Sequence, residues 1–200
     1  RELGRMIKEA GIDFINLPDE DYDAPMGEYT GAGTIFGATG GVMEAALRTV
    51  YAVVTGENLP SLDITPVRGL EGVKEATVKV GALGDVKVAV AHGLGNARKI
   101  MDRIKEGKAD YAFIEIMCCP GGCIAGGGEP IPTNNEMRKL RTSALYKDDG
   151  QVQKLRQSHE NPSIKKVYEK FLKEPLGHKS HKLLHTHYTK RGTDLPHRKD

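Results

Sequence analysis

The chain has 200 residues, of which 38% are hydrophobic, 28% are charged and 24 are glycine, with a formal net charge of +2. This length predicts one large domain or two small ones, with enough apolar residues to bury a core. The near-neutral net charge, the absence of tryptophan and the 6% of aromatic residues argue against a nucleic-acid-binding surface. No apolar run approaches the ~20 residues that a membrane span needs, so we expect none.

The hydrophobic periodicity predicts an α/β body. In chain order, the pattern predicts a helix over 3–10, a strand over 12–17, an acidic loop over 18–29, a helix over 42–55, strands over 73–80 and 86–91, a helix over 95–106 and a buried strand over 111–117. Strands that alternate with helices are typical of α/β proteins. The chain starts at Arg1 with this first helix under way and shows no signal-peptide pattern. We therefore expect a piece of a longer polypeptide without an export signal.

The charge divides the chain near residue 130. Residues 1–130 hold 13 Lys and Arg against 19 Asp and Glu, whereas residues 131–200 hold 16 against 8. Five of the seven histidines also lie between residues 178 and 197. The basic part predicts short helices over 137–145, 152–157, 164–172 and 180–187. These helices have too little apolar surface to fold alone, so we expect this tail to lie against the acidic body.

A cysteine motif follows the last predicted strand. Cys118, Cys119 and Cys123 lie within six positions, a crowding that indicates a metal or redox site in a reducing compartment. Pro120 suits the first position of a helix, which would place Cys119 at its cap and Cys123 one turn further. Both sulfurs would then face one side, as two ligands of an iron–sulfur cube require. The glycines around them, at 121, 122 and 126–128, allow backbone to approach a bulky inorganic group.

Several motifs together identify a family. MCCPGGCIAGGGEP (117–130) resembles the last H-cluster motif of the [FeFe]-hydrogenases. FGATGGVMEAALR (36–48) resembles a second motif of that family, 83 residues earlier when counted from Phe36 to Cys119. PIPTNNEMRKLRTSALY and HKSHKLLHTHYTKR resemble the small-subunit-type tail that is fused to cytoplasmic members. The resemblance covers essentially the whole chain, and two motifs at family-like spacing are more specific than CPGGC alone.

The resemblance implies the fold and its division. Residues 1–130 are expected to form the C-terminal part of the iron-hydrogenase catalytic domain, with a mixed sheet flanked by helices. Residues 131–200 are expected to form a small-subunit-like helical tail that wraps this body.

The resemblance also implies the cofactor and its ligands. The family interconverts H₂ with protons and electrons at an H-cluster, a [4Fe–4S] cube bridged by one cysteine to a two-iron unit with CO, CN and a dithiolate amine. By match, Cys119 ligates the cube, and Cys123 ligates it and bridges to the two-iron unit. Met117 matches the thioether beside that unit, so Cys123 and Met117 are the expected catalytic residues. The expected cofactor-binding residues are Met117, Gly122, Phe36, Gly37, Thr39, Gly40 and Gly41.

The chain departs from the family pattern in three respects. Cys118 replaces the usual alanine before the first ligand, and Glu129 replaces a glutamine. The two other ligand motifs and the residues of the proton relay do not occur in this sequence. We therefore expect the missing upstream half of the catalytic domain to supply them, and further [4Fe–4S] or [2Fe–2S] clusters to lie upstream or on partner subunits.

The leading hypothesis is part of a cytoplasmic, multisubunit hydrogenase, either an NAD(H)-linked electron-bifurcating enzyme or a hydrogen-dependent CO₂ reductase with electron-transfer partner subunits. One alternative is a hydrogenase-like iron–sulfur assembly protein that lacks the two-iron unit. The intact FGATGGVMEAALR segment argues against it, because that segment lines the two-iron site in the family. A second alternative is an H₂-sensing regulator with the same site.

Simpler interpretations accompany individual residues. Cys119 and Cys123 could be a structural or redox dithiol, Met117 a core residue, and glycines 37–41 a tight turn. We expect Cys118 to be small and buried, pointing away from the cluster. Glu115 is expected to be buried in an ion pair with a lysine or arginine. The histidines with metal-like spacing are expected to form the polar face of a docked helix rather than a metal site; they are His178, His181, His185 and His187.

Overall fold

The computed structural model describes residues 1–20, 23 and 28–189. Part of the predicted acidic loop and the end of the tail motif, with the histidine at 197, lie outside these residues. The chain divides into two compact units, residues 1–161 and 162–200. The charge-based boundary near residue 130 stays a prediction, but residues 131–161 belong to the first unit together with the acidic body.

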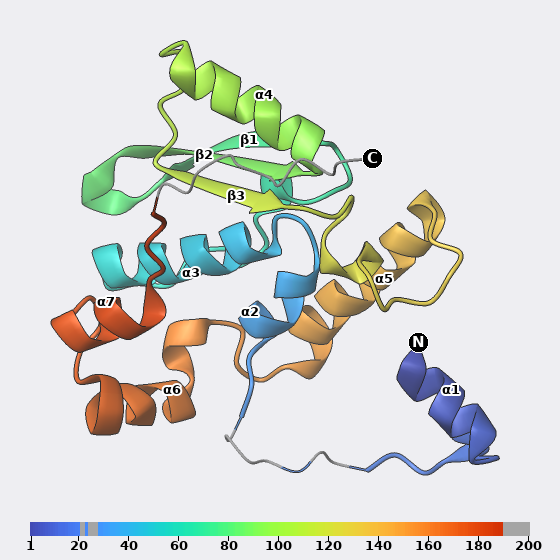
Figure 1. The fold of residues 1–200 in the computed structure, drawn as a ribbon. Coiled ribbons are helices and arrows are strands. Elements are labelled where there is room, and N and C mark those ends of the chain that lie inside the picture. The colour runs from blue at the N-terminus through green and yellow to red at the C-terminus, as the bar shows by residue number, and fades with distance from the viewer. Residues whose placement is uncertain (21–22, 24–27, 190–200) are drawn as a thin grey trace. The chain divides into compact units, whose positions relative to one another are not determined.

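A three-stranded mixed sheet forms the centre of the first unit (Figure 1). Strand β1 (Val73–Lys79) pairs antiparallel with β2 (Asp85–His92), and β2 pairs parallel with β3 (Phe113–Met117). The α/β class, the mixed sheet and three of the four expected strands, those over 73–80, 86–91 and 111–117, are confirmed. The register sets His92 opposite Met117, at the end of the sheet from which the cysteine motif leaves.

Helices cover both faces of the sheet. Helix α3 (Gly41–Thr55) lies on one face and α4 (Leu94–Lys105) on the other (Figure 1). Because successive side chains of a strand point to opposite faces, Val88 and Val90 of β2 pack in the cluster that contains α3 residues, whereas Ala89 and Ala91 pack with Ile100 of α4. The apolar residues 88–91 of β2 are therefore buried on both faces of the sheet.

The first predicted strand is wrong. Helix α1 (Glu2–Glu9) forms as expected, but residues 12–17 contain the 3₁₀ turn η1 (Phe14–Asn16). Asn16 donates from its side chain to the Asp13 carboxylate at 2.7 Å and from its backbone to the Asp13 carbonyl at 3.2 Å. These local hydrogen bonds favour a turn over an extended strand.

Short helical segments lie between the longer elements of the first unit. They are α2 (Gly31–Thr34), η2 (Ile35–Gly37), η3 (Thr65–Val67), η4 (Gly81–Leu83), η5 (Cys123–Ala125), η6 (Asp148–Val152) and η7 (Ser158–Glu160). Helix α5 (Asn135–Lys147) is longer than predicted, because the Asn134 side chain accepts from the Met137 amide at 2.9 Å and caps its start. The predicted helix over 152–157 is wrong, since the chain beyond η6 is extended at Gln153.

The described part of the second unit consists mostly of short helical segments. It contains α6 (Pro162–Val167), the π-turn η8 (Tyr168–Leu172) and α7 (His178–Leu184). The predicted helix over 164–172 is confirmed as helical, whereas the one over 180–187 starts and ends earlier. None of the helices in the described part of the chain is both long and apolar enough to cross a membrane.

A closed ring of six alternating charges joins α3 to the tail within the first unit. Arg48 of α3 contacts Glu44 at 2.7 Å and Asp149 at 2.9 Å, and all three side chains are fully buried. The ring continues through Arg156, Asp63 and Arg68 back to Glu44, with contacts of 2.7, 2.8, 2.8 and 2.6 Å. We call these six residues the charge ring. Its members come from both sides of residue 130.

The charge ring predicts acid sensitivity of the fold. Burial by itself raises the pKa of Asp149, but hydrogen bonds from Arg48 and Arg156 outweigh it and leave the pKa below its ordinary value. Hydrogen bonds from Arg156 and Arg68 likewise lower the pKa of Asp63. A carboxyl with a lowered folded-state pKa stabilises the fold above its unfolded pKa of about 3.9, and this stabilisation is lost as the pH falls.

We expect Asp149→Asn to lower the free energy of unfolding by about 3–5 kcal/mol at pH 7, because Arg48 then keeps a buried charge with one partner removed. Urea denaturation measures this loss. The variant should also lose less stability than the wild type between pH 5 and 3. Asp85→Asn, an exposed position on β2, is the control. Equal losses in the two variants would contradict a stabilising role for the ring.

Candidate functional site

The cysteine loop, residues 118–129, begins with a tight turn after β3. The Gly122 amide donates to the Cys119 carbonyl at 3.0 Å, with Pro120 and Gly121 at the centre of the turn. Gly121 has a φ of +87°, which matches a type II turn with proline at its second and glycine at its third position. The expected helix start at Pro120 is therefore wrong, because the chain cannot enter an α-helix through such a turn. A single 3₁₀ turn, η5, follows at Cys123.

The thiols of the loop lie at the surface of this chain. Cys119 is half-buried, and Cys118 and Cys123 are exposed. The expectation of a buried Cys118 is wrong, because β3 ends at Met117 and the alternation of the strand does not continue past it. Gly126 packs close to Cys119, since a Cβ at this position would lie 3.4 Å from Cys119 Sγ and 3.3 Å from the Cys123 carbonyl oxygen.

The two sequence motifs touch through their backbones. The Thr39 amide donates to the Gly121 carbonyl at 3.0 Å. Gly122 has φ +102° and ψ −166°, a region that is essentially restricted to glycine. A Cβ on Gly122 would lie 2.7 Å from both the Gly37 carbonyl oxygen and the Thr39 nitrogen. Gly122 thus allows the two motifs to meet, and its expected contact with the cofactor stays a prediction.

The glycines at the start of α3 also have a packing role. Gly40 has a φ of +92°, and a Cβ on it would collide with the Val67 carbonyl. A Cβ on Gly41 would collide with the Ile35 carbonyl. Gly37 lies between Leu145 of α5 and Ile124 of the cysteine loop. Phe36 is 45% exposed in η2, beside these contacts.

Glu115 of β3 ties the cysteine strand to the start of α3. Its buried carboxylate accepts from the Gly40 amide at 2.6 Å and from the Met43 amide at 2.7 Å. No lysine or arginine in the described ranges forms the expected ion pair with Glu115. Instead, the first amides of α3, which have no partner within the helix, and the positive end of the helix dipole compensate the charge.

His92 holds the cysteine loop from the neighbouring strand. The Gly121 amide donates to His92 Nδ1 at 3.1 Å, which assigns the proton to Nε2, and Nε2 then donates to the Leu70 carbonyl at 3.2 Å. Sequence reasoning missed this residue. One signal in the sequence could have identified it: His92 is a polar residue at the end of the apolar strand β2, and β2 pairs with β3, the strand that leads into the cysteines.

Arg141 of α5 holds the loop from the tail. Its guanidinium donates to the Ile124 carbonyl at 2.7 Å and to the Pro130 carbonyl at 2.9 Å. This residue was also missed, because nothing in the sequence distinguishes it from the other basic residues of the tail. The tail thus fixes the backbone next to Cys123.

The structure brings part of the expected site together. Residues 37–41 lie against the cysteine loop, and Met117 enters it half-buried, with its carbonyl accepting from the Gly93 amide at 2.8 Å. Cys119 and Cys123 supply two thiols, which fit two of the four ligands of an iron–sulfur cube. The described residues, with His178, His181, His185 and His187 among them, contain no group of three or more His, Cys, Asp or Glu that could hold a metal ion.

The chain matches two sequence families. Residues 1–127 match the iron only hydrogenase large subunit, C-terminal domain, and residues 135–191 match the iron hydrogenase small subunit. The NADP-reducing hydrogenase subunit HndD of Solidesulfovibrio fructosivorans is 55% identical over 192 residues, which are 96% of this chain and 32% of that protein. The periplasmic [Fe] hydrogenase large subunit of Nitratidesulfovibrio vulgaris is 56% identical over 147 residues, or 73% of this chain and 35% of that protein.

Solved structures give the same result. A variant of the [FeFe]-hydrogenase HydA1 from Chlamydomonas reinhardtii superimposes with a TM-score of 0.72 at 44% identity, covering 94% of this chain and 53% of that one.

A more distant sequence relative is Protein NAR1 of Arabidopsis thaliana, 30% identical over 194 residues, which are 94% of this chain and 40% of that protein. The chain spans about a third of the length of these two hydrogenase relatives, HndD and the periplasmic large subunit.

Gly122→Ala tests the contact between the motifs. We expect it to lower the free energy of unfolding by at least about 2 kcal/mol, because a Cβ is strained at this φ and has no room against residues 37–39. Gly127→Ala, in the same loop, is the matched control, since nothing lies within 4 Å of its Cβ position. Urea denaturation compares the two, and equal stability would contradict the close approach.

Proposed function

Because the chain belongs to the iron-only hydrogenase family, we propose that it forms the C-terminal part of a hydrogenase catalytic domain, residues 1–130, with a fused small-subunit-type tail, residues 131–200. The observation that carries this proposal is the direct backbone contact between the cysteine loop and the segment 37–41. In the hydrogenase family, the segment that matches the cysteine loop ligates the H-cluster, and the segment that matches residues 37–41 wraps its two-iron unit.

The residues of this chain would hold part of the cofactor. Cys119 and Cys123 would ligate the cube, and Cys123 would bridge to the two-iron unit, with Met117 and Phe36 beside it. The bound H-cluster supplies the redox chemistry that interconverts protons and H₂. The protein contributes a preorganised frame: His92, Arg141 and Glu115 fix the backbone on which the thiols and the wrapping segment are carried.

We place the remaining parts of the enzyme outside this chain. Two more cube ligands and the proton relay would come from the upstream half of the catalytic domain. Electrons would arrive through further iron–sulfur clusters, upstream or on partner subunits. This division agrees with the share of its relatives that the chain covers and with the two ligand thiols that it offers.

The tail favours a cytoplasmic, multisubunit enzyme linked to a nicotinamide cofactor. The match to HndD, named as a subunit of an NADP-reducing hydrogenase, spans 192 residues, whereas the match to the periplasmic large subunit spans 147. A longer match is expected for a relative in which the tail is fused to the catalytic chain, because the match then includes the tail as well as the catalytic part. H₂-dependent reduction of NAD⁺ or NADP⁺ by the purified complex distinguishes this proposal from a CO₂ reductase, which would produce formate instead.

Cysteine variants of the complete enzyme test the ligand assignment. We expect Cys119→Ala to lose bound iron and H₂ turnover. Cys123→Ala should lose turnover and the infrared bands of CO and CN, because its bridging thiolate has no substitute in the loop. Cys118→Ala is the matched control. It should keep iron content, both bands and most activity, with stability changed by no more than about 0.5 kcal/mol, because its side chain is exposed.

The outcomes separate the alternatives. Normal bands and rate in Cys123→Ala would refute the assigned bridge, and loss of iron in Cys118→Ala would show that the ligands were assigned to the wrong cysteines. A matured wild type that binds iron but shows no CO or CN bands would indicate the assembly-protein alternative. Normal bands with negligible turnover would indicate the H₂ sensor.

A further inference from the structure

A buried lysine lies behind the segment that meets the cysteine loop. Lys74 of β1 is 5% exposed, and its ammonium donates to the Gly69 carbonyl at 2.8 Å. It also lies 3.4 Å from both the carbonyl oxygen and the Oγ1 of Thr39. Thr39 in turn donates its amide to Gly121. A single residue therefore separates this charge from the cysteine loop.

No carboxylate forms an ion pair with Lys74 among the described residues. Glu115 and Glu71 both favour its charged form, but the oxygens of Glu115 already accept from two amides of α3. A buried ammonium without an ion pair is costly, and three backbone or hydroxyl oxygens compensate it only in part. A neutral residue of similar shape would fill the same space at lower cost, so the charge itself requires an explanation.

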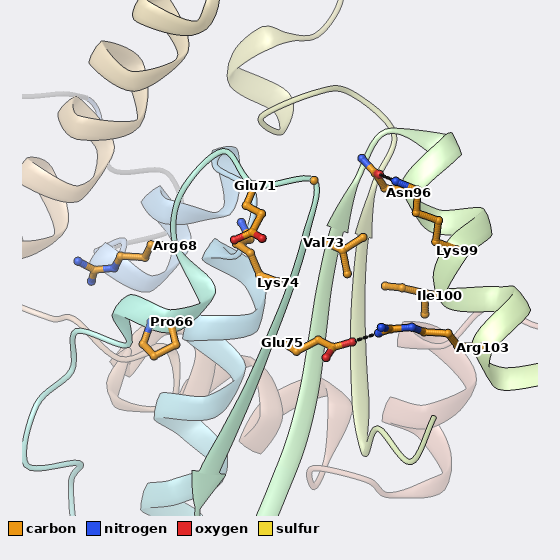
Figure 2. A pocket seen from close by; sticks show the side chains of 11 residues that line it. Pro66, Arg68, Glu71, Val73, Lys74, Glu75, Asn96, Lys99, Ile100 and Arg103 are labelled. Atoms are coloured by element: carbon orange, nitrogen blue, oxygen red, sulfur yellow. Dashed lines mark hydrogen bonds and ion pairs between the residues drawn. The ribbon is translucent and has the colours of Figure 1, made fainter. Parts of the chain in front are cut away.

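Lys74 also borders a pocket. The pocket has a volume of about 630 Å³ and lies between β1 and α4, with Lys74, Glu71 and Arg68 at one side and Asn96, Lys99 and Arg103 at the other (Figure 2). Burial lowers the pKa of Lys74 to about 8, so its charge can change near neutral pH.

We infer that Lys74 is a positioning residue for the cofactor: its ammonium fixes Thr39 against the cysteine loop and places one positive charge behind the thiol-bearing turn. This inference rests on the proposed function. A positive charge in a poorly solvated site stabilises the cluster more in its reduced, more negative state. Protonated Lys74 should therefore raise the reduction potential of the cube, and this contribution should disappear as the pH rises through about 8.

Other ionisable groups surround Lys74. They are Glu71 and Arg68 before β1, Glu75 on β1, His92 on β2, Glu115 on β3, and Lys99 and Arg103 on α4. Only replacement of Lys74 itself isolates its contribution, and the other groups remain as a common background in every variant.

The experiment measures the midpoint potential of the cube against pH. The complete enzyme is produced without the two-iron unit, and the potential is followed by electron paramagnetic resonance from pH 6.5 to 10 in the wild type, Lys74→Met and Lys74→Arg. Lys99→Met, an exposed lysine on the same pocket, is the matched control. This readout does not depend on hydrogenase turnover.

The three curves have different expected shapes. The wild-type potential should fall as the pH passes about 8, whereas Lys74→Met should start at a lower potential and show no such fall. Lys74→Arg should stay high over the whole range, because arginine keeps its charge. Lys99→Met should follow the wild type.

A Lys74→Met curve parallel to that of the wild type would overturn the inference. If Lys74→Met does not fold, Lys74→Arg decides alone: a fall near pH 8 that persists in this variant also overturns it. Absence of any cube in the wild-type enzyme would instead refute the proposed function, so the two failures are distinguishable.

Discussion

Two backbone segments 83 residues apart in sequence meet at Gly122 with no room for a side chain between them. The rest of the site depends on this close approach. It requires glycine at a φ of +102°, a sheet that ends at the same point, and a helix whose first turn faces that end. Glu115 provides the link, because one carboxylate on the cysteine strand accepts from two amides of α3. Any shift of the helix relative to the strand would leave a buried carboxylate without its donors.

The polar residues around the site act mainly on backbone atoms. His92 accepts from Gly121, Arg141 donates to Ile124, and Lys74 donates to Gly69, all from outside the cysteine loop. A buried polar group that loses such a partner costs about 1–3 kcal/mol, so each bond selects one position of the chain. Irregular segments are ordinarily the mobile parts of a protein. Here hydrogen bonds from His92 and Arg141 hold the cysteine loop. Such restraint suits a loop that must present two thiols at fixed positions.

The sequence predicts the helices and strands of the sheet region well, because burial of one face gives α3, β1 and α4 a clear periodicity, and burial of both faces gives residues 88–91 of β2 an unbroken apolar run. It fails where local chemistry decides. Residues 12–17 are apolar enough for a strand, yet Asp13 and Asn16 form a local turn. The helix predicted at Pro120 is replaced by a turn that Gly121 permits. His92 and Arg141 could not be recognised as site residues, because their partners are carbonyls and amides, which occur at every position and leave no pattern.

The charge ring shows why net charge was an incomplete guide to the tail. The acidic body and the basic tail suggested attraction between opposite net charges. In the structure, however, the basic Arg48 comes from the acidic body and the acidic Asp149 from the basic tail. Exposed charges further apart than about 10 Å are largely screened at physiological salt, whereas buried contacts below 3 Å are not. The pairing therefore depends on where a few side chains are buried, and the surplus lysines of the tail contribute little to it.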